Sequence, residues 1–97
     1  HAEIFQPFYE SLPIAGIDGT LEHRMKKTKA YRKVRAKTGT VKGVSSLAGY
    51  AQAANGHLLA FVIINQNVMK ARQARAWQDK VCQALCSSDL IIGTPTP

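Results

Sequence analysis

Residues 34–49 read VRAKTGTVKGVSSLAG, and this stretch decides the fold of the chain. Over residues 34–41 the side chains alternate between two sides, which predicts a strand with one polar face. One side carries Val34, Ala36, Thr38 and Thr40, and the other carries Arg35, Lys37, Gly39 and Val41. Lys42 and Gly43 then predict a turn, and residues 46–54 alternate again as a second strand.

A third strand is predicted over residues 57–65, after the pair Asn55-Gly56. An Asn-Gly pair between two alternating runs is the strongest short-range signal for a two-residue type I′ hairpin. The near-continuous apolar run over residues 58–64 predicts burial on both faces of this strand. Turns this short give three consecutive antiparallel strands, a meander.

Helical spacing before the strands predicts two short helices. Residues 4–12 carry apolar side chains three and four positions apart, which predicts a helix with Pro7 in its first turn. Residues 13–19 hold turn-forming residues, and Thr20 is expected to cap a second short helix that ends at residue 25.

An amphipathic helix is predicted after the strands, over residues 68–86, with Asn65 or Asn67 as its cap. It is expected to lie on the sheet, with Trp77 as a core anchor. The expected core-facing positions are Ala74, Trp77, Val81, Ala84 and Leu85. The predicted fold class is therefore α+β, a three-stranded meander with a C-terminal helix packed on it.

The positive charge of the chain is local. Thirteen Lys and Arg against six Asp and Glu give a net charge of +7, and most of these bases lie between residues 24 and 42. Residues 26–33 hold five bases, so we expect an exposed loop there. Such a patch suits nucleic acid, an anionic membrane or polymer, or a small carboxylate substrate, and charge alone does not choose among them.

The two cysteines, Cys82 and Cys86, fall four residues apart in the predicted helix. At that spacing their Cβ atoms are about 5–6 Å apart, whereas a disulfide needs ~3.5–4.5 Å. We therefore expect free, part-buried thiols, and neither a zinc site nor any other metal site. His23 and His57 have no carboxylate at useful spacing and are expected at the surface.

The sequence at each end of the chain leads to a prediction. His1 takes the place of an initiator Met and leads directly into apolar sequence, which suggests a cut inside a longer protein, with further chain upstream of His1. No signal peptide is recognisable, and no window reaches the length of a transmembrane helix. Residues 93–97 contain two prolines and are predicted to be a disordered tail.

The triplet Lys37-Thr38-Gly39 carries the chemistry. It is not a phosphate-binding loop, which needs Gly before its Lys. In acyl transfer from a peptide that ends in a carboxylate, Lys37 supplies a fixed positive charge, and Thr38 and Thr40 supply hydroxyl groups. Gly39 lets a substrate backbone approach, and the Thr40 N–H can donate to an oxyanion.

Four segments resemble one family, the D-alanyl-D-alanine carboxypeptidases/endopeptidases, which are the dacB-type, class C low-molecular-mass penicillin-binding proteins. They are residues 12–21 (LPIAGIDGTL), Arg24, residues 36–44 (AKTGTVKGV) and residues 47–50 (LAGY). The Lys-Thr-Gly triplet belongs to the active-site set of penicillin-binding proteins and class A β-lactamases. By this resemblance residues 1–92 are the C-terminal portion of a transpeptidase-like domain, and residues 18–21 form a structural turn with Asp18 as a turn or cap residue.

The resemblance implies a periplasmic serine peptidase that acts on peptidoglycan stem peptides ending in D-Ala-D-Ala through an acyl-enzyme. It implies β-lactam inhibitors, no cofactor and no nucleic-acid partner. Carried over by position, the catalytic groups are Lys37 and the Thr40 N–H as oxyanion donor. The substrate-binding residues are Thr38, Gly39, Thr40 and Lys42.

The chain departs from this family in one major respect. None of its five serines has a Lys three residues downstream or an Asn two residues downstream, so the nucleophile, its base and the middle motif are absent. We expect the chain alone to be inactive. The alternative is a non-enzymatic binding module, whose basic patch over residues 24–42 would hold nucleic acid or an anionic polymer.

Overall fold

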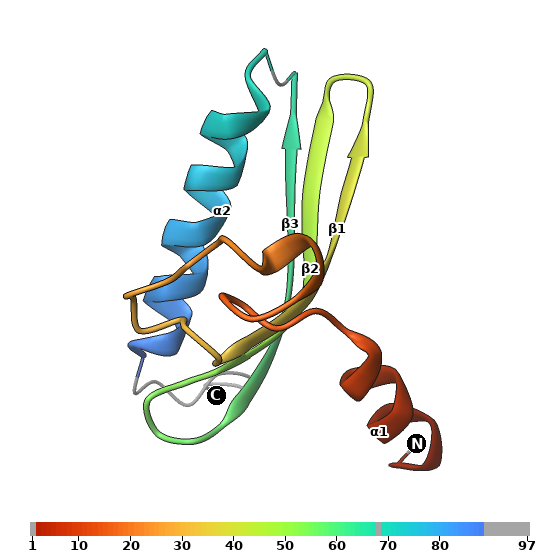
Figure 1. Ribbon diagram of the computed structural model, residues 1–97, viewed down its shortest axis with the longest axis vertical. Helices are drawn as coiled ribbons and strands as arrows, with labels where there is room; N and C mark the ends of the chain where they lie inside the picture. The colour runs from red at the N-terminus through yellow and green to blue at the C-terminus, as the bar shows by residue number, and fades with distance from the viewer. Residues whose placement is uncertain (1, 68, 89–97) are drawn as a thin grey trace, which may run out of the picture.

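The computed structural model describes residues 2–67 and 69–88 of the chain (Figure 1). In order, the elements are helix α1 (Ala2–Ser11), 3₁₀-helix η1 (Gly19–Leu21), strands β1 (Val34–Val41), β2 (Val44–Gln52) and β3 (Leu58–Gln66), and helix α2 (Ala71–Cys86). The predicted α+β meander with a C-terminal helix is confirmed. The predicted tail, residues 93–97, lies outside the described residues.

The sheet has the order β1-β2-β3, with both pairs antiparallel. β1 has the predicted bounds, whereas β2 begins and ends two residues before the predicted positions. Val41 pairs with Val44 around the predicted turn at Lys42 and Gly43, and Gly43 takes a positive φ of 74°. A residue without a Cβ adopts this left-handed conformation at no steric cost.

The second turn is not the predicted two-residue type I′ hairpin. That turn needs a positive φ at both central residues, but Asn55 does not have one, and only Gly56 does, at 86°. The Gly56 N–H donates to the Ala53 carbonyl at 2.9 Å, and the Asn55 side chain accepts from the His57 N–H at 3.0 Å. The result is a longer loop closed by a left-handed glycine.

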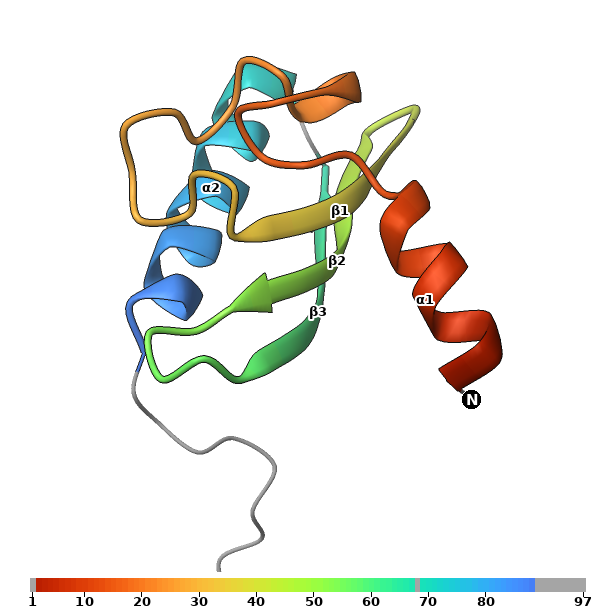
Figure 2. The same cartoon turned by 60° about the horizontal axis from the view of Figure 1, so that its bottom comes forward.

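The molecule has a sheet with a helix on each side, as Figure 2 shows most clearly. α2 packs along one face, and α1 meets the other face only at one end, where Phe5 and Tyr9 make edge-on contacts with the ring of Tyr50. Tyr50 therefore packs against α1 as well as on the sheet. The core lies between α2, the sheet and the segment before β1; its largest buried side chains include Leu21, Val34, Leu47 and Cys82.

β3 is buried on one face only, so the prediction of burial on both faces was wrong. Residues along it alternate between exposed and half-buried, and Leu58, Val62 and Ile64 are 43%, 69% and 58% exposed. The half-buried residues Phe61 and Ile63 pack against the core beneath α2. Within the described part of the chain, nothing comparable to α2 covers the opposite face (Figure 2).

The buried stripe of α2 also differs from the predicted one. It consists of Ala74, Gln78, Cys82 and Cys86, which follow one another at four-residue steps. Val81 and Leu85 are half-buried, as a core-facing position requires, but Ala84 is exposed and Trp77 is 55% exposed. Trp77 is therefore not a core anchor. The prediction selected core-facing positions by their apolar character alone. It therefore missed the centre of the stripe, which is a glutamine.

Three further predictions, all about where the helices begin, were wrong. α1 begins at Ala2, so Pro7 lies inside the helix and beyond the first turn. The short helix near residue 20 is a 3₁₀ turn with Asp18, not Thr20, at its N-cap. α2 begins after Lys70 without a side-chain cap, because Asn65 belongs to β3 and Asn67 takes a left-handed φ of 57°.

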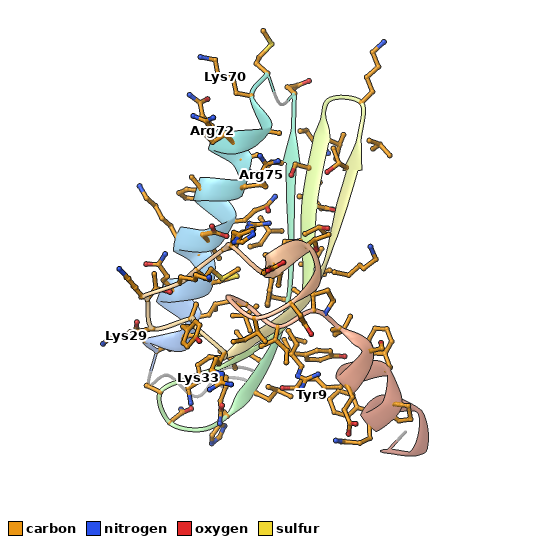
Figure 3. The ribbon with its side chains drawn as sticks, in the orientation of Figure 1. Tyr9, Lys29, Lys33, Lys70, Arg72 and Arg75 are labelled. Carbon is orange, nitrogen blue, oxygen red and sulfur yellow. The ribbon has the colours of Figure 1, made fainter. Side chains whose placement is uncertain are left out.

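The basic loop over residues 26–33 is exposed at each of its five bases, as expected. Ala30 is nevertheless fully buried within it. Lys27 and Arg32 adopt positive φ values, and these bends bring the loop alongside α2, where Figure 3 labels Lys29 and Lys33. His23 and His57 are exposed, as predicted.

Candidate active-site strand

β1 is an edge strand of the sheet, and the Lys37-Thr38-Gly39 triplet lies in its middle. The register places Thr38 and Thr40 on the face that α2 covers, together with the buried Leu47. Lys37 lies on the opposite face, across from Ala48. The alternation predicted from the sequence is confirmed, and the two threonine hydroxyls and the Lys37 ammonium approach the strand edge from different sides.

The outer edge of β1 is paired at its start and open near its end. The Ala36 N–H donates to the Pro13 carbonyl at 3.0 Å, and the Val34 carbonyl accepts from Ala15 at 2.9 Å. These bonds point away from β2, and backbone direction alternates along a strand. Thr38 and Thr40 have the same parity as Ala36, so their N–H and C=O groups point to this outer edge.

Lys37 is exposed, and its ammonium group lies 3.3 Å from the Thr38 carbonyl. Its side chain borders a groove of about 750 Å³ on the sheet face opposite α2. The other walls of this groove include Phe8, Leu12, Pro13, Tyr50 and Val62. The Lys37 ammonium group therefore lies at the edge of this mainly apolar groove, next to the open end of β1.

Thr38 is connected to the turn that precedes β1 in the chain. Its hydroxyl donates to the Thr20 hydroxyl at 3.1 Å. Asp18, at the start of the same turn, accepts a hydrogen bond from the Ile14 N–H at 2.7 Å. Asp18 is thus a turn residue, as predicted, and the Gly-x-Asp-Gly-Thr-Leu run lies against the strand that carries the triplet.

Gly39 faces the Lys37 side of the sheet, opposite Ser46 of β2. The Ser46 hydroxyl donates to the Gly39 carbonyl at 3.3 Å. A Cβ atom at Gly39 would lie 2.6 Å from that Ser46 oxygen, the free end of a rotatable side chain. Gly49 is more tightly enclosed, because a Cβ there would meet the Arg35 carbonyl and lie 2.6 Å from the Ala36 Cα.

Lys42 lies at the exposed tip of the β1–β2 hairpin. Thr40 and Lys42 border a second hollow of about 310 Å³, which Met69 and Ala71 close from the N-terminal end of α2. Lys42 is therefore on the same side of the hairpin as the helix end at which Figure 3 labels Lys70 and Arg72.

Sequence reasoning missed a buried polar cluster between α2 and the sheet. Gln78 is fully buried and donates to the Ser45 hydroxyl at 3.1 Å and to the Asn65 side chain at 3.0 Å. Arg24 donates to Asp79 at 2.6 Å and to the Gln78 side-chain carbonyl at 3.1 Å. The signal for it was faint: one Arg in a segment of family resemblance and one Gln inside a helix.

The two thiols are free and buried. Burial, with smaller contributions from Cys86 and Asp79 and an opposing one from Arg24, raises the pKa of the Cys82 thiol to about 12. Burial also raises the pKa of Cys86. A thiol that stays protonated is a poor nucleophile and a poor metal ligand. Among the described residues, no three His, Cys, Asp or Glu side chains gather as a metal site requires.

Comparison with known proteins decides the family. The model of the D-Ala-D-Ala carboxypeptidase 3 (S13) family matches residues 1–87. The chain belongs to this family. No helix that the structure describes is long and apolar enough to cross a membrane.

Relatives and solved structures agree with this S13 assignment. The chain is 48% identical over 65 residues to a D-alanyl-D-alanine carboxypeptidase of Actinomadura sp. (strain R39) and 41% identical over 66 residues to the carboxypeptidase DacB of Mycolicibacterium smegmatis, matches that cover 62% and 64% of this chain. A crystal structure of penicillin-binding protein 4 (dacB) from Haemophilus influenzae, complexed with a β-lactam, superposes on 84% of the chain with a TM-score of 0.73 and 32% identity. The matches span 12–14% of the two relatives and 21% of the solved chain.

Proposed function

We propose that this S13 chain supplies the Lys-Thr-Gly strand of a serine-type D-Ala-D-Ala carboxypeptidase/endopeptidase that acts on peptidoglycan stem peptides in the periplasm. The observation that carries the proposal is the open edge of β1. There, outward-pointing backbone groups of Thr38 and Thr40 lie beside the exposed ammonium group of Lys37. The nucleophilic serine and its base then come from a part of the protein outside this chain.

Each residue has a defined task in this proposal. The Lys37 ammonium and the hydroxyls of Thr38 and Thr40 bind the terminal carboxylate of the D-Ala-D-Ala peptide by charge-assisted hydrogen bonds. For this the Thr38 hydroxyl turns its proton from Thr20 to the carboxylate and accepts a hydrogen bond from the Thr20 hydroxyl instead. Gly39 leaves room for the substrate backbone, which adds to the free edge of β1 as an extra strand. Lys42 borders the site of the peptide side chain.

The chemistry is acyl transfer in two steps. The serine oxygen attacks the carbonyl carbon of the penultimate residue, and the Thr40 N–H donates to the oxyanion that forms. The C–N bond breaks, a proton passes to the departing amine, and D-Ala leaves. Water then hydrolyses the ester. A β-lactam acylates the same serine in this proposal, and the solved structure of the Haemophilus influenzae relative in complex with a β-lactam supports the binding of such a compound.

The family membership favours this function over a non-enzymatic basic module. A labelling experiment with a fluorescent penicillin tests it. The chain alone has no serine in the required motif and should remain unlabelled, whereas the longer protein that contains it should form a stable acyl adduct. An adduct on the isolated chain, or none on the longer protein, would contradict the proposal.

Lys37→Ala in the longer protein provides the residue-level test. Loss of hydrogen bonds to a charged group costs about 1.5–3 kcal/mol, so acylation should slow by about 10- to 150-fold. Because Lys37 is exposed, thermal stability should change little. Lys29→Ala removes a similarly exposed charge from the basic loop and should acylate at the normal rate. Equal rates for the two variants would contradict the assignment of Lys37.

A further inference from the structure

A row of three polar residues crosses the sheet at the proposed oxyanion donor. Thr40 of β1 pairs with Ser45 of β2, and Ser45 pairs with Asn65 of β3. Thr40 and Ser45 form a pair without mutual backbone hydrogen bonds, in which the Cα atoms approach to about 4.5 Å and the side chains are closest. Ladder bonds at the neighbouring pairs hold the backbone on either side of Thr40, and Thr40 itself meets β2 through its pairing with Ser45.

Gln78 of α2 holds this row from one side. Its Nε2 donates to the Ser45 Oγ at 3.1 Å and to the Asn65 Oδ1 at 3.0 Å, so both amide protons are used. Gln78 is 0% exposed and Ser45 is 4% exposed. Buried hydrogen bonds of this kind have no competing water and fix the side chains that they join. Gln78 thus attaches α2 to the row at its central member.

Arg24 fixes the orientation of the Gln78 amide. Its Nη2 donates to the Gln78 Oε1 at 3.1 Å, which leaves the amide nitrogen directed at the sheet. The same guanidinium pairs with Asp79 at 2.6 Å and donates to the Arg75 carbonyl at 3.1 Å. Figure 3 labels Arg75 on the turn of α2 where this contact occurs. The charged pair is mostly buried and anchors the segment after η1 to α2.

We infer that Gln78 is a positioning residue, which acts through Ser45 to hold the Thr40 N–H in the geometry that stabilises the oxyanion. This inference rests on the proposed function. The end of β1 has a free outer edge and a hairpin tip beyond it, so β2 alone supports it from within the sheet. A displacement of about 1 Å in a catalytic group can lower a rate a hundredfold.

The test compares Gln78→Met with Gln73→Met in the longer protein. Gln73 lies exposed on the same helix, so it controls for the loss of an amide from α2. Active sites are titrated with fluorescent penicillin, so that kcat refers to folded enzyme only. Because the oxyanion exists only in the transition state, Gln78→Met should lower kcat by about 10- to 100-fold and change KM less than about twofold. Gln73→Met should change neither by more than about twofold.

Two further variants separate positioning from general stability. In Gln78→Glu the carboxylate still accepts from Arg24, the Ser45 hydroxyl can turn to donate to it, and the Asn65 amide can flip to donate its Nδ2, so most of kcat should return. Ser45→Ala should lower kcat like Gln78→Met, and the double variant should be no slower than the slower single variant. Normal kcat per titrated site in Gln78→Met, or a fall in KM and kcat that follows thermal stability alone, would overturn the inference.

A measurement that does not depend on enzyme activity separates the positioning role of Gln78 from the proposed function. The backbone amide resonance of Thr40 should shift in Gln78→Met and stay in place in Gln73→Met. If the wild-type protein neither releases D-Ala nor reacts with penicillin, the proposed function fails, and this resonance alone decides whether Gln78 positions Thr40. An unmoved Thr40 resonance in Gln78→Met would overturn the inference, whatever the activity.

Discussion

The Thr38 hydroxyl donates a hydrogen bond to the Thr20 hydroxyl over 3.1 Å, and this contact joins two segments 18 residues apart. Thr20 belongs to the turn with the Gly-x-Asp-Gly-Thr-Leu run, and Thr38 belongs to the Lys-Thr-Gly triplet. The two segments that carry the family resemblance therefore meet in space. The turn holds the rotamer of a side chain to which we assign a carboxylate-binding role.

Thr20→Val should weaken that role without loss of the fold. Thr20 is exposed, and valine keeps the shape of the side chain while removing the hydroxyl that supports Thr38, either by accepting its proton or by donating to its oxygen. A neutral hydrogen bond contributes about 0.5–1.5 kcal/mol, so acylation by penicillin in the longer protein should slow by about two- to tenfold. Thr28→Val removes a hydroxyl from the basic loop and serves as the control for the rate. An unchanged rate in Thr20→Val would show that the contact has no part in binding.

Gly49→Ala should mainly lower stability, whereas Gly39→Ala should mainly lower the rate of acylation. The new methyl group at Gly49 would meet the backbone at Arg35 and Ala36, which cannot turn aside, so β1 and β2 must separate. We expect about 3 kcal/mol of destabilisation, measured as the free energy of unfolding in urea. At Gly39 the methyl group meets only the end of the Ser46 side chain.

The Gly39→Ala chain should therefore lose less than about 1 kcal/mol, because Ser46 can change rotamer. In the longer protein the same variant should slow penicillin acylation at least tenfold, since the methyl group stands where the substrate backbone approaches. If Gly39→Ala acylates normally, the substrate does not lie along β1 as proposed. If Gly49→Ala is as stable as the wild-type chain, β1 and β2 do not approach each other at Gly49 as closely as the structure shows.

Asp79→Ala should destabilise the chain by about 2 kcal/mol. It leaves the mostly buried Arg24 guanidinium without its carboxylate partner, and an uncompensated charge in such a place is costly. Glu22→Ala is the control, since Glu22 is exposed and faces only His23 at 3.9 Å. That exposed pair should contribute well under 1 kcal/mol. Urea unfolding followed by the fluorescence of the single Trp77 measures both variants, and equal effects would contradict the structural role of Arg24 and Asp79.

Because its Cys82 thiol is buried, the folded chain should lose stability at alkaline pH. Its thiol has an ordinary pKa of 9.0 and a folded-state pKa of about 12. Between these values the unfolded chain has lost the proton and the folded chain still holds it, so the free energy of unfolding falls as pH rises from 9 towards 12. Below pH 9 both states are protonated and the full stability remains. Urea unfolding at pH 8 and at pH 10.5 should show a steeper loss in the wild-type chain than in Cys82→Ala; equal losses would contradict the burial of the thiol.

The strands and their order could be predicted from the sequence because they depend on local patterns. Alternation set the bounds of β1 correctly, and the turn residues Gly43 and Gly56 marked both reversals. The Lys37-Thr38-Gly39 triplet was placed on the first strand for the same reason. Local pattern did not give the type of the second turn, because Asn55 uses its side chain as an acceptor for the His57 N–H instead of taking a left-handed backbone conformation.

Burial was less predictable, because it depends on partners that are distant in the sequence. From the sequence alone, Gln78 is expected on the exposed face of an amphipathic helix. In the structure it is buried, because Arg24, Ser45 and Asn65 satisfy its amide group. Once Gln78 occupies the centre of the buried stripe, Trp77 turns outward. The apolar run in β3 likewise suggested two covered faces, whereas α2 covers only one of them.

The open edge of β1 also carries a risk of self-association. Unpaired N–H and C=O groups that suit an extended peptide also suit the edge of another copy of the same chain, and natural proteins guard such edges with charged side chains, lysine above all. Lys37 and Lys42 lie on this strand and at its hairpin tip. Two copies that paired edge to edge would bring these like charges together. The lysines that favour a carboxylate-ended peptide therefore also discourage the polymerisation of the sheet.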